Sequence, residues 1–242
     1  MAGVMIGARY NLLEAGGKAL LPKRRPSYAA EMFLRITSAL ALLSATPLLA
    51  QTAAPLTPAV PTTPPAAAAA QSDLVRVAME TEQGRIVLAL DRGRAPATVA
   101  NFLRYVDAHR FDGISFYRAM PYGEPGNGMI QSGITDPAKL YPPVKFESTE
   151  QTGLHHDAGA ISMAMTTPGT ARATFFILAG PIPGFDAKAG DPGFATFGHV
   201  VEGLDVVKAI LAAPIDPAKG DNYFKGQMLA KPVKVLKVTR LP

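Results

Sequence analysis

The amino-acid sequence predicts a mostly antiparallel β domain with one early and one late α-helix. Short runs of alternating apolar and polar residues lie between Gly and Pro, a pattern typical of half-buried strands. Two segments have the apolar spacing of a helix, and each has a Pro at one of its ends. The sequence has no internal repeat and no regular alternation of strands with helices, so a parallel sheet is not expected.

The domain is expected to begin with a β-hairpin, followed by the first helix. Alternating runs cover residues 75–79 and 86–90, and Gly84 supplies the turn between them. Pro96 suits the first turn of the helix, where its missing N–H costs nothing. The helical stripe consists of residues spaced i, i+3, i+4 and i+7, namely Val99, Phe102, Leu103 and Val106.

The middle and the end of the domain are predicted to be mainly β. Between Gly113 and Gly198 the clearest β-like runs are Ile161–Met165 and Phe175–Leu178. A second helix is expected from Leu204 to Ala212, and a last strand after Pro232.

Residues 1–72 have a different composition and are expected to lie outside the domain of residues 73–242. We interpret residues 1–50 as a leader whose part 32–50 is a secretory signal peptide, cleaved after Ala50. Its apolar run is shorter than the roughly 20 residues that span a bilayer, so no stable membrane insertion is expected after processing. A core helix is the alternative. Residues 51–72 are rich in Pro, Ala and Thr, which predicts an extended, disordered linker.

The net charge of +5 belongs mainly to the leader. Residues 1–72 contain six Lys and Arg against two Glu, so +4 of the total lies there and the domain is nearly neutral. A near-neutral domain lacks the basic surface of a nucleic-acid-binding protein, so no nucleic-acid partner is expected.

The usual catalytic groups are scarce. The chain has no Cys, which excludes a thiol nucleophile and a thiolate metal site. Of the four His, His155 and His156 are adjacent and point apart, which favours solvated surface side chains over a metal site. No Ser lies in a nucleophile elbow, and Gly126-Asn127-Gly128 lacks the residues of a phosphate loop. No metal and no cofactor are therefore expected.

A collinear series of short motifs extends over nearly all of residues 75–211. The motifs are Gly84–Leu88, Ala95–Phe102, Phe111–Gly113, Phe116-Tyr117-Arg118, Met129-Ile130-Gln131, Gly159–Ala164, Phe175–Ile177, Phe197–Gly203 and Asp205–Val207. Together they resemble the cyclophilins, and most of all the short bacterial members. The resemblance implies a closed eight-stranded antiparallel β-barrel capped by two α-helices, and peptidyl-prolyl cis-trans isomerase activity on proline-containing polypeptide segments.

The resemblance also implies the site. Arg118 would be the catalytic donor, and Gln131 would orient it or the substrate backbone. The substrate-binding residues would be Phe116, Met129, Ala164, Thr174, Phe176, Phe185 and Phe194. Only one residue of Phe175-Phe176 is expected to face the site, because neighbours on a strand face opposite sides.

Several positions depart from the family pattern. Gly128 replaces a pocket Phe, Phe194 replaces a His, Thr174 replaces a Gln, and the family's Trp is absent because the chain has none. Tyr122, in an insertion before Met129, is a candidate to refill the pocket. The leader and the resemblance together lead us to expect an exported, monomeric, periplasmic isomerase that assists the folding of exported proteins. The substituted pocket motivates the alternative, a cyclophilin-fold chaperone that binds peptides with little or no catalysis.

Overall fold

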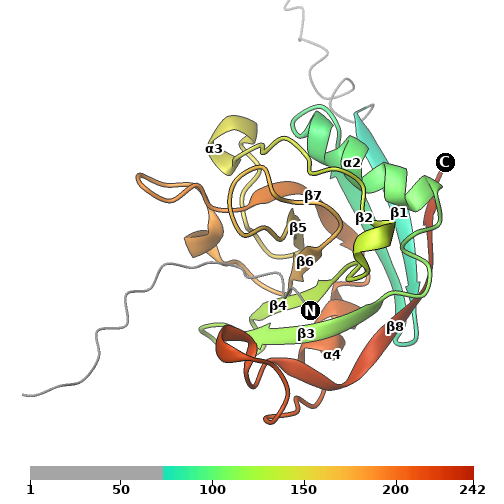
Figure 1. Cartoon of the computed structure of the whole chain (residues 1–242), viewed down its shortest axis with the longest axis vertical. Coiled ribbons are helices and arrows are strands. Elements are labelled where there is room, and N and C mark those ends of the chain that lie inside the picture. The colour runs from blue at the N-terminus through green and yellow to red at the C-terminus, as the bar shows by residue number, and fades with distance from the viewer. Residues whose placement is uncertain (1–72) are drawn as a thin grey trace, which may run out of the picture. The chain divides into compact units, whose positions relative to one another are not determined.

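The computed structural model describes residues 73–242 (Figure 1). The predicted leader, residues 1–50, and the predicted linker, residues 51–72, lie outside the described residues.

Eight antiparallel strands close into one barrel, as the sequence analysis predicted. The strand order is β1-β2-β7-β5-β6-β4-β3-β8, and β1 pairs with both β2 and β8, so the sheet closes on itself. The strands are β1 Leu74–Thr81, β2 Gly84–Asp91, β3 Ser115–Pro121, β4 Gly128–Ser132, β5 Ala160–Met163, β6 Phe175–Leu178, β7 Ala195–Glu202 and β8 Met228–Arg240.

Two longer helices pack on the barrel, and both were predicted. Helix α2 (Pro96–Asp107) packs against β2, β7 and β8, whereas α4 (Leu204–Leu211) packs against β2, β3 and β4. Pro96 begins α2, and the carboxylate of Glu147 accepts hydrogen bonds from the backbone N–H groups of Ala97 and Thr98 at 3.1 and 2.9 Å. This carboxylate satisfies donors that a helix start otherwise leaves unpaired.

The shorter helices were not predicted. Helix α3 (Thr149–Thr152) is one turn, capped by Ser148 and Gln151. The 3₁₀ turns are η1 (Pro137–Lys139), η2 (Pro183–Phe185) and η3 (Asn222–Phe224).

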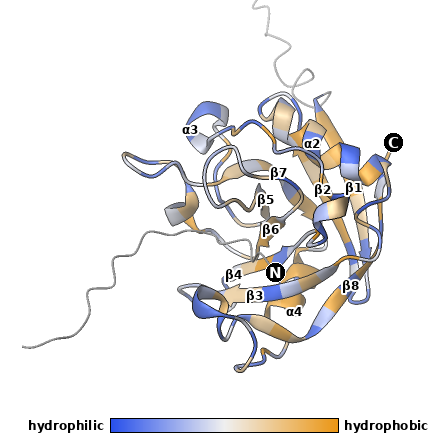
Figure 2. Ribbon diagram, in the orientation of Figure 1, coloured by the Kyte–Doolittle hydropathy of each residue, from blue (hydrophilic) through white to orange (hydrophobic). Residues whose placement is uncertain are grey.

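In Figure 2 the β1–β2 hairpin is largely apolar, whereas α3 is hydrophilic.

The predicted start of the last strand was wrong. Strand β8 begins at Met228 and contains Pro232, which is exposed. The pairing of β3 with β8 is irregular in this part of β8, and the irregularity accommodates a residue that has no N–H to donate.

Aromatic rings fill the barrel. Phe102 from α2 lies 4.9 Å from Phe111, 5.4 Å from Phe175 and 5.3 Å from Phe197 between ring centroids. Side chains alternate across the barrel wall, so Ile130 and Ile177 face this core while their neighbours on β4 and β6 face outward. The outward-facing residues of β4 and β6 form part of the candidate site.

Candidate active site

One row of residues crosses five strands of the barrel wall in register. Arg118 on β3 pairs with Gln131 on β4, which pairs with Phe176 on β6. The row continues from Phe176 to Ser162 on β5 and Thr196 on β7. Directly opposed residues in an antiparallel sheet lie close enough for their side chains to interact. The barrel therefore brings together three residues that the sequence analysis assigned to the site.

The guanidinium of Arg118 lies between two glutamines. Its Nη1 donates to Gln131 Oε1 at 2.7 Å, while Nε and Nη2 donate to Gln227 Oε1 at 2.9 and 2.5 Å. Nη2 also contacts the sulfur of Met120 at 3.4 Å, and Gln131 Nε2 donates to the hydroxyl of Tyr117 at 2.9 Å. These bonds fix the plane of the guanidinium, and Arg118 is 0% exposed.

The charge of Arg118 is not neutralised by a carboxylate within the described part of the chain, since none of the ion pairs found there includes it. Burial lowers the pKa of Arg118, and the nearby Tyr223 and Tyr117 raise it in part. An arginine remains charged after such a shift. Burial also raises the pKa of Tyr117, partly opposed by its hydrogen bond to Gln131 and by the charge of Arg118. Both phenol and guanidinium thus keep their usual states at neutral pH.

An apolar cluster adjoins this row on the outside of the barrel. It contains Met120, Met129, Ala160, Ala164, Phe176, Leu178 and Ile182, with the half-buried Phe185 and Phe194 packed on it. The ring of Phe176 meets Phe185 and Phe194 nearly edge-on, with centroid distances of 5.6 and 5.4 Å. Five of the predicted substrate-binding residues, Met129, Ala164, Phe176, Phe185 and Phe194, therefore lie together.

The other two predicted substrate-binding residues differ. Thr174 is half-buried at the margin, where its carbonyl accepts a hydrogen bond from the N–H of Ala164 at 2.9 Å. Phe116 does not lie where the sequence analysis expected: it is 0% exposed and packs inside the barrel, with its ring centroid 6.3 Å from that of Phe175. Two residues apart on a regular strand, Phe116 and Arg118 would share a face, but an irregularity between them turns Phe116 inward.

A buried histidine beside the cluster was missed. His155 and His156 were expected to be solvated surface side chains, but His156 is only 1% exposed. Its Nδ1 lies 2.6 Å from Asp186 Oδ1, and its Nε2 lies 3.1 Å from the hydroxyls of both Ser162 and Thr196. The ring stacks on Phe176 with an interplanar angle of 15°. No feature of the sequence joins residues 156 and 186.

This pair is a neutral imidazole beside an ionised carboxylate. Burial lowers the pKa of His156 below 6.5, and the hydrogen bond to Asp186 opposes the shift only in part. Burial raises the pKa of Asp186, but hydrogen bonds from His156 and His155 outweigh this effect and bring it below 3.8. Nδ1 therefore carries the proton of His156, and the single lone pair of Nε2 is shared between the two hydroxyls.

The insertion after β3 explains one departure from the family pattern. A Cβ at Gly128 would lie 2.3 Å from the carbonyl oxygen of Met120, and the φ angle there is +148°, so only Gly fits. Tyr122 instead lies beside the cluster, with its ring 6.4 Å from that of Phe185 and its side chain 45% exposed. Asn127 donates to the carbonyl of Pro181 at 2.9 Å and so joins the insertion to the loop that carries Phe185.

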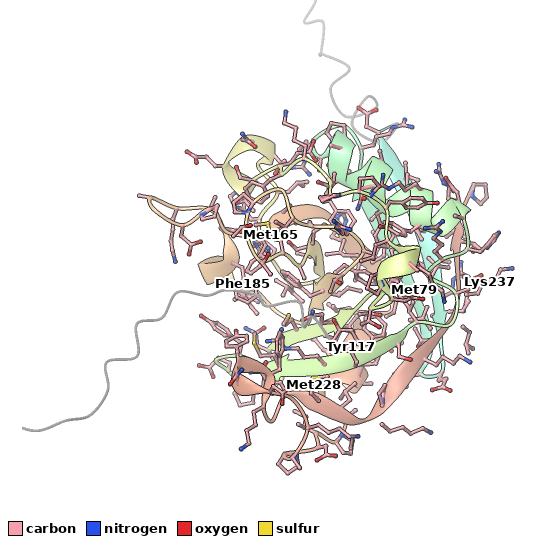
Figure 3. The ribbon with its side chains drawn as sticks, in the orientation of Figure 1. Met79, Tyr117, Met165, Phe185, Met228 and Lys237 are labelled. Carbon is pink, nitrogen blue, oxygen red and sulfur yellow. The ribbon has the colours of Figure 1, made fainter. Side chains whose placement is uncertain are left out.

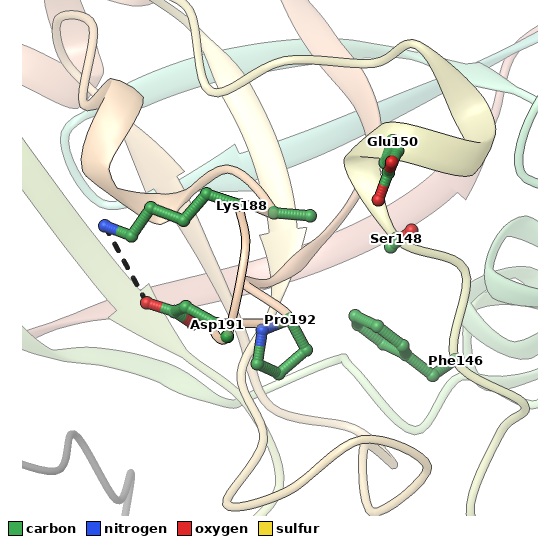
Figure 4. Close-up of a pocket in the computed structure, with 8 residues that line it drawn as sticks. Phe146, Ser148, Glu150, Lys188, Asp191 and Pro192 are labelled. Atoms are coloured by element: carbon green, nitrogen blue, oxygen red, sulfur yellow. Dashed lines mark ion pairs between the residues drawn. The ribbon is translucent and has the colours of Figure 1, made fainter. Parts of the chain in front are cut away.

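A hollow of about 340 Å³ (Figure 4) is lined by eight residues, none of which was assigned to the site. They are Phe146, Ser148, Glu150, Ala187, Lys188, Gly190, Asp191 and Pro192. Its charges are partly paired, since Lys188 and Asp191 lie 3.8 Å apart. Among residues 73–242 no three His, Asp or Glu side chains are grouped to hold a metal ion, and no helix is long and apolar enough to cross a membrane.

Comparison with known proteins gives one consistent result. Residues 76–240 match the family model described as "Cyclophilin type peptidyl-prolyl cis-trans isomerase/CLD". The chain is 32% identical over 164 residues to a peptidyl-prolyl cis-trans isomerase of Acinetobacter baylyi, covering 67% of this chain and 83% of that protein. It is 37% identical over 147 residues to peptidyl-prolyl cis-trans isomerase A of Dickeya dadantii, covering 60% and 75%.

Solved structures agree on the fold. A cyclophilin-type peptidyl-prolyl cis-trans isomerase of Cryptosporidium parvum, solved in the presence of the dipeptide Ala-Pro, has a TM-score of 0.55 at 19% identity. The match covers 69% of this chain and 99% of that one.

Proposed function

This chain belongs to the cyclophilin-type peptidyl-prolyl cis-trans isomerase family, and from that premise we propose that it accelerates X–Pro isomerisation in exported polypeptides as they fold. Rotation about an X–Pro bond has a barrier of about 20 kcal/mol because amide resonance is lost. No covalent bond is made or broken, so the protein needs only to bind the twisted amide more tightly than the planar one.

In this proposal Arg118 binds the twisted amide. The prolyl nitrogen regains a lone pair when the amide twists, and a guanidinium N–H can donate to it. Arginine suits this role because its charge is permanent and its donors form a rigid plane. Gln131 holds that plane from one side. Phe176 is only 1% exposed, and the half-buried rings of Phe185 and Phe194 that pack on it offer the apolar surface for the pyrrolidine.

The single observation that carries the proposal is the register row. It sets a charged donor, its orienting amide and an aromatic ring on three neighbouring strands, next to an apolar cluster. The donor and the proline-binding surface therefore belong to one rigid wall.

Three variants test these roles. Arg118→Ala should lower kcat/KM by about 10²–10³ and change ground-state peptide affinity less, because the bond forms mainly in the twisted state. Arg118→Lys should fail comparably, since a flexible ammonium does not reproduce the planar donors. Phe176→Ala should weaken binding and rate together. Arg92→Ala, an exposed arginine elsewhere, is the control. Wild-type activity in a folded Arg118→Ala variant would remove Arg118 from the mechanism.

One observation favours a second candidate function, a peptide-binding chaperone with little catalysis. Arg118 is fully covered, and its Nε, Nη1 and Nη2 groups all donate within the protein. A guanidinium that stays covered can contribute to the fold but not to the twisted amide. Peptide binding by the wild-type protein without isomerisation above the thermal rate would favour this candidate.

We further propose that residues 32–50 direct export and are removed, which places the mature protein in the periplasm as a soluble monomer. The short apolar run and the Pro-rich spacer at 51–72 support this. Mass spectrometry should find an N-terminus near Gln51 in the periplasmic fraction, and light scattering should give the monomer mass. The full chain in the cytosol would contradict the proposal.

A further inference from the structure

A segment from the far end of the chain covers Arg118. Residues Lys219–Gln227, the cover segment, lead into β8 and lie beside β3 (Figure 1). The rings of Tyr223 and Phe224 have their centroids 5.2 and 4.7 Å from the guanidinium carbon, and Gln227 accepts from Nε and Nη2. Figure 3 shows Tyr117, next to Arg118, close to Met228 at the start of β8. A peptide cannot reach the guanidinium while this segment is in place.

The group that Gln227 offers to Arg118 is itself an amide. Its carbonyl oxygen is the same kind of acceptor as the oxygen of a peptide bond, and it accepts from two of the donor groups that a peptide would use. A peptide amide can therefore replace the Gln227 carboxamide with little change in hydrogen-bond strength. A carboxylate at this position would instead form a charge-assisted, bidentate pair that a peptide could not match.

The cover segment is lightly held. None of its nine residues is buried, and Asp221, Asn222, Tyr223, Lys225 and Gly226 are exposed. Most of its backbone hydrogen bonds are internal turns, and its main backbone link to the barrel is the bond from the Ala119 N–H to the Gln227 carbonyl at 2.9 Å. Gly220 and Gly226, with φ of +87° and +72°, lie near its two ends. Segments with few buried contacts open at low free-energy cost.

We propose that Gln227 is an internal competitor of the substrate for the donors of Arg118. It holds the Arg118 guanidinium in its plane in the resting protein, and a proline peptide replaces its carboxamide as the cover segment moves off. This inference rests on the proposed isomerase function. Because binding then requires the open form, the apparent dissociation constant rises by the reciprocal of the open fraction, and the chemical step is unaffected.

Opposite substitutions of Gln227 test the competition. Gln227→Ala should lower KM by about three- to tenfold, since two modest hydrogen bonds no longer hold the closed form, and leave kcat within about twofold. Gln227→Glu should raise KM by at least about tenfold, because its carboxylate would hold Arg118 as an ion pair. Gln83→Ala and Gln83→Glu, in the exposed turn between β1 and β2, are matched controls.

A fluorescent reporter follows the movement directly. The chain has no Trp, so Phe224→Trp provides a single indole over the guanidinium. Its emission should move to longer wavelength when an Ala-Pro-containing tetrapeptide saturates the protein, and should not move with the Ala-Ala counterpart. Unchanged emission at saturation, or equal losses of kcat in both Gln227 variants at constant KM, would overturn the competition and leave the isomerase function standing. If neither the wild type nor Gln227→Ala binds or isomerises the peptide, both proposals fail.

Discussion

Two loops flank the candidate site, and they are held in opposite ways. The first, residues 179–194, carries Phe185 and Phe194, and Asp186 joins it to the buried His156. The second is the cover segment, which carries Tyr223, Phe224 and Gln227 and has no buried residue. A loop held by a buried, fully hydrogen-bonded pair is expected to be fixed, whereas one held by exposed turns is expected to move.

The difference assigns separate tasks to the two loops. In the proposed mechanism the first loop would hold the apolar surface for the proline ring, because that surface must be the same for the cis and the trans peptide. The cover segment would lie over a charged donor that the mechanism needs only while the amide is twisted.

Removing the anchor of the fixed loop should have the largest effect. Asp186→Ala deprives the Nδ1–H of His156 and its backbone N–H of their acceptor, which lies 2.6 and 2.9 Å away. Leaving buried donors unpaired costs about 1–3 kcal/mol each, so the free energy of unfolding should fall by about 2–4 kcal/mol. Urea denaturation measures it. Lys188→Ala, which removes only an exposed ion pair on the same loop, should change it by less than about 1 kcal/mol.

Lowering the pH should also act on the pair of His156 and Asp186, and should lower the free energy of unfolding by a smaller amount. Burial lowers the pKa of His156 from 6.5 in the folded protein. Just below pH 6.5 this imidazole is therefore protonated in the unfolded chain but still neutral in the folded one, which favours unfolding. Stability should therefore be full above about pH 6.5 and decline below it, by at most about 1.4 kcal/mol per pH unit from this one group.

The neighbouring charged groups do not change this window. Asp186 stays ionised because its pKa lies below 3.8, and its own contribution is lost only near and below that value. The charge of Asp157 favours the imidazolium, and that of His155 opposes it. Denaturation curves between pH 5 and 8 should show the decline in the wild type and a flatter profile in His156→Asn. Equal slopes in the two proteins would mean that another group titrates.

Shortening the side chain of Phe224 in the cover segment should have the smallest effect on stability. Phe224→Ala removes a ring that is half-buried and lies over Arg118, a contact worth about 0.5–1 kcal/mol. The free energy of unfolding should fall by no more than that, and α4 and β8 should keep their protection from hydrogen exchange. A loss as large as that of Asp186→Ala would show that the cover segment is part of the fixed structure.

The periodic elements could be predicted from the sequence because each depends on local spacing. The hairpin, α2 and α4 occur where the apolar residues recur at intervals of two or of three and four. Phe116 could not be placed in this way, because an irregularity between two strands far apart in the sequence reverses its face.

The candidate site residues followed from the resemblance to a family rather than from periodicity. Arg118, Gln131 and Phe176 lie within the short motifs that carry this resemblance, although only the register shows that they are neighbours. Gln227 is 109 positions from Arg118, and Asp186 is 30 positions from His156. Both contacts depend on how loops cross the finished barrel, and neither Gln227 nor Asp186 belongs to a motif.

The closed ring of strands has a consequence for a protein that would work among unfolded chains. Every strand described here has a partner on both sides, since β1 bonds to β2 and to β8. An open sheet edge offers a template on which extended polypeptides can add as a further strand, a frequent first step of aggregation. A client segment that meets this barrel finds no such template. Adding a strand to the sheet is therefore not a route by which such a segment could bind.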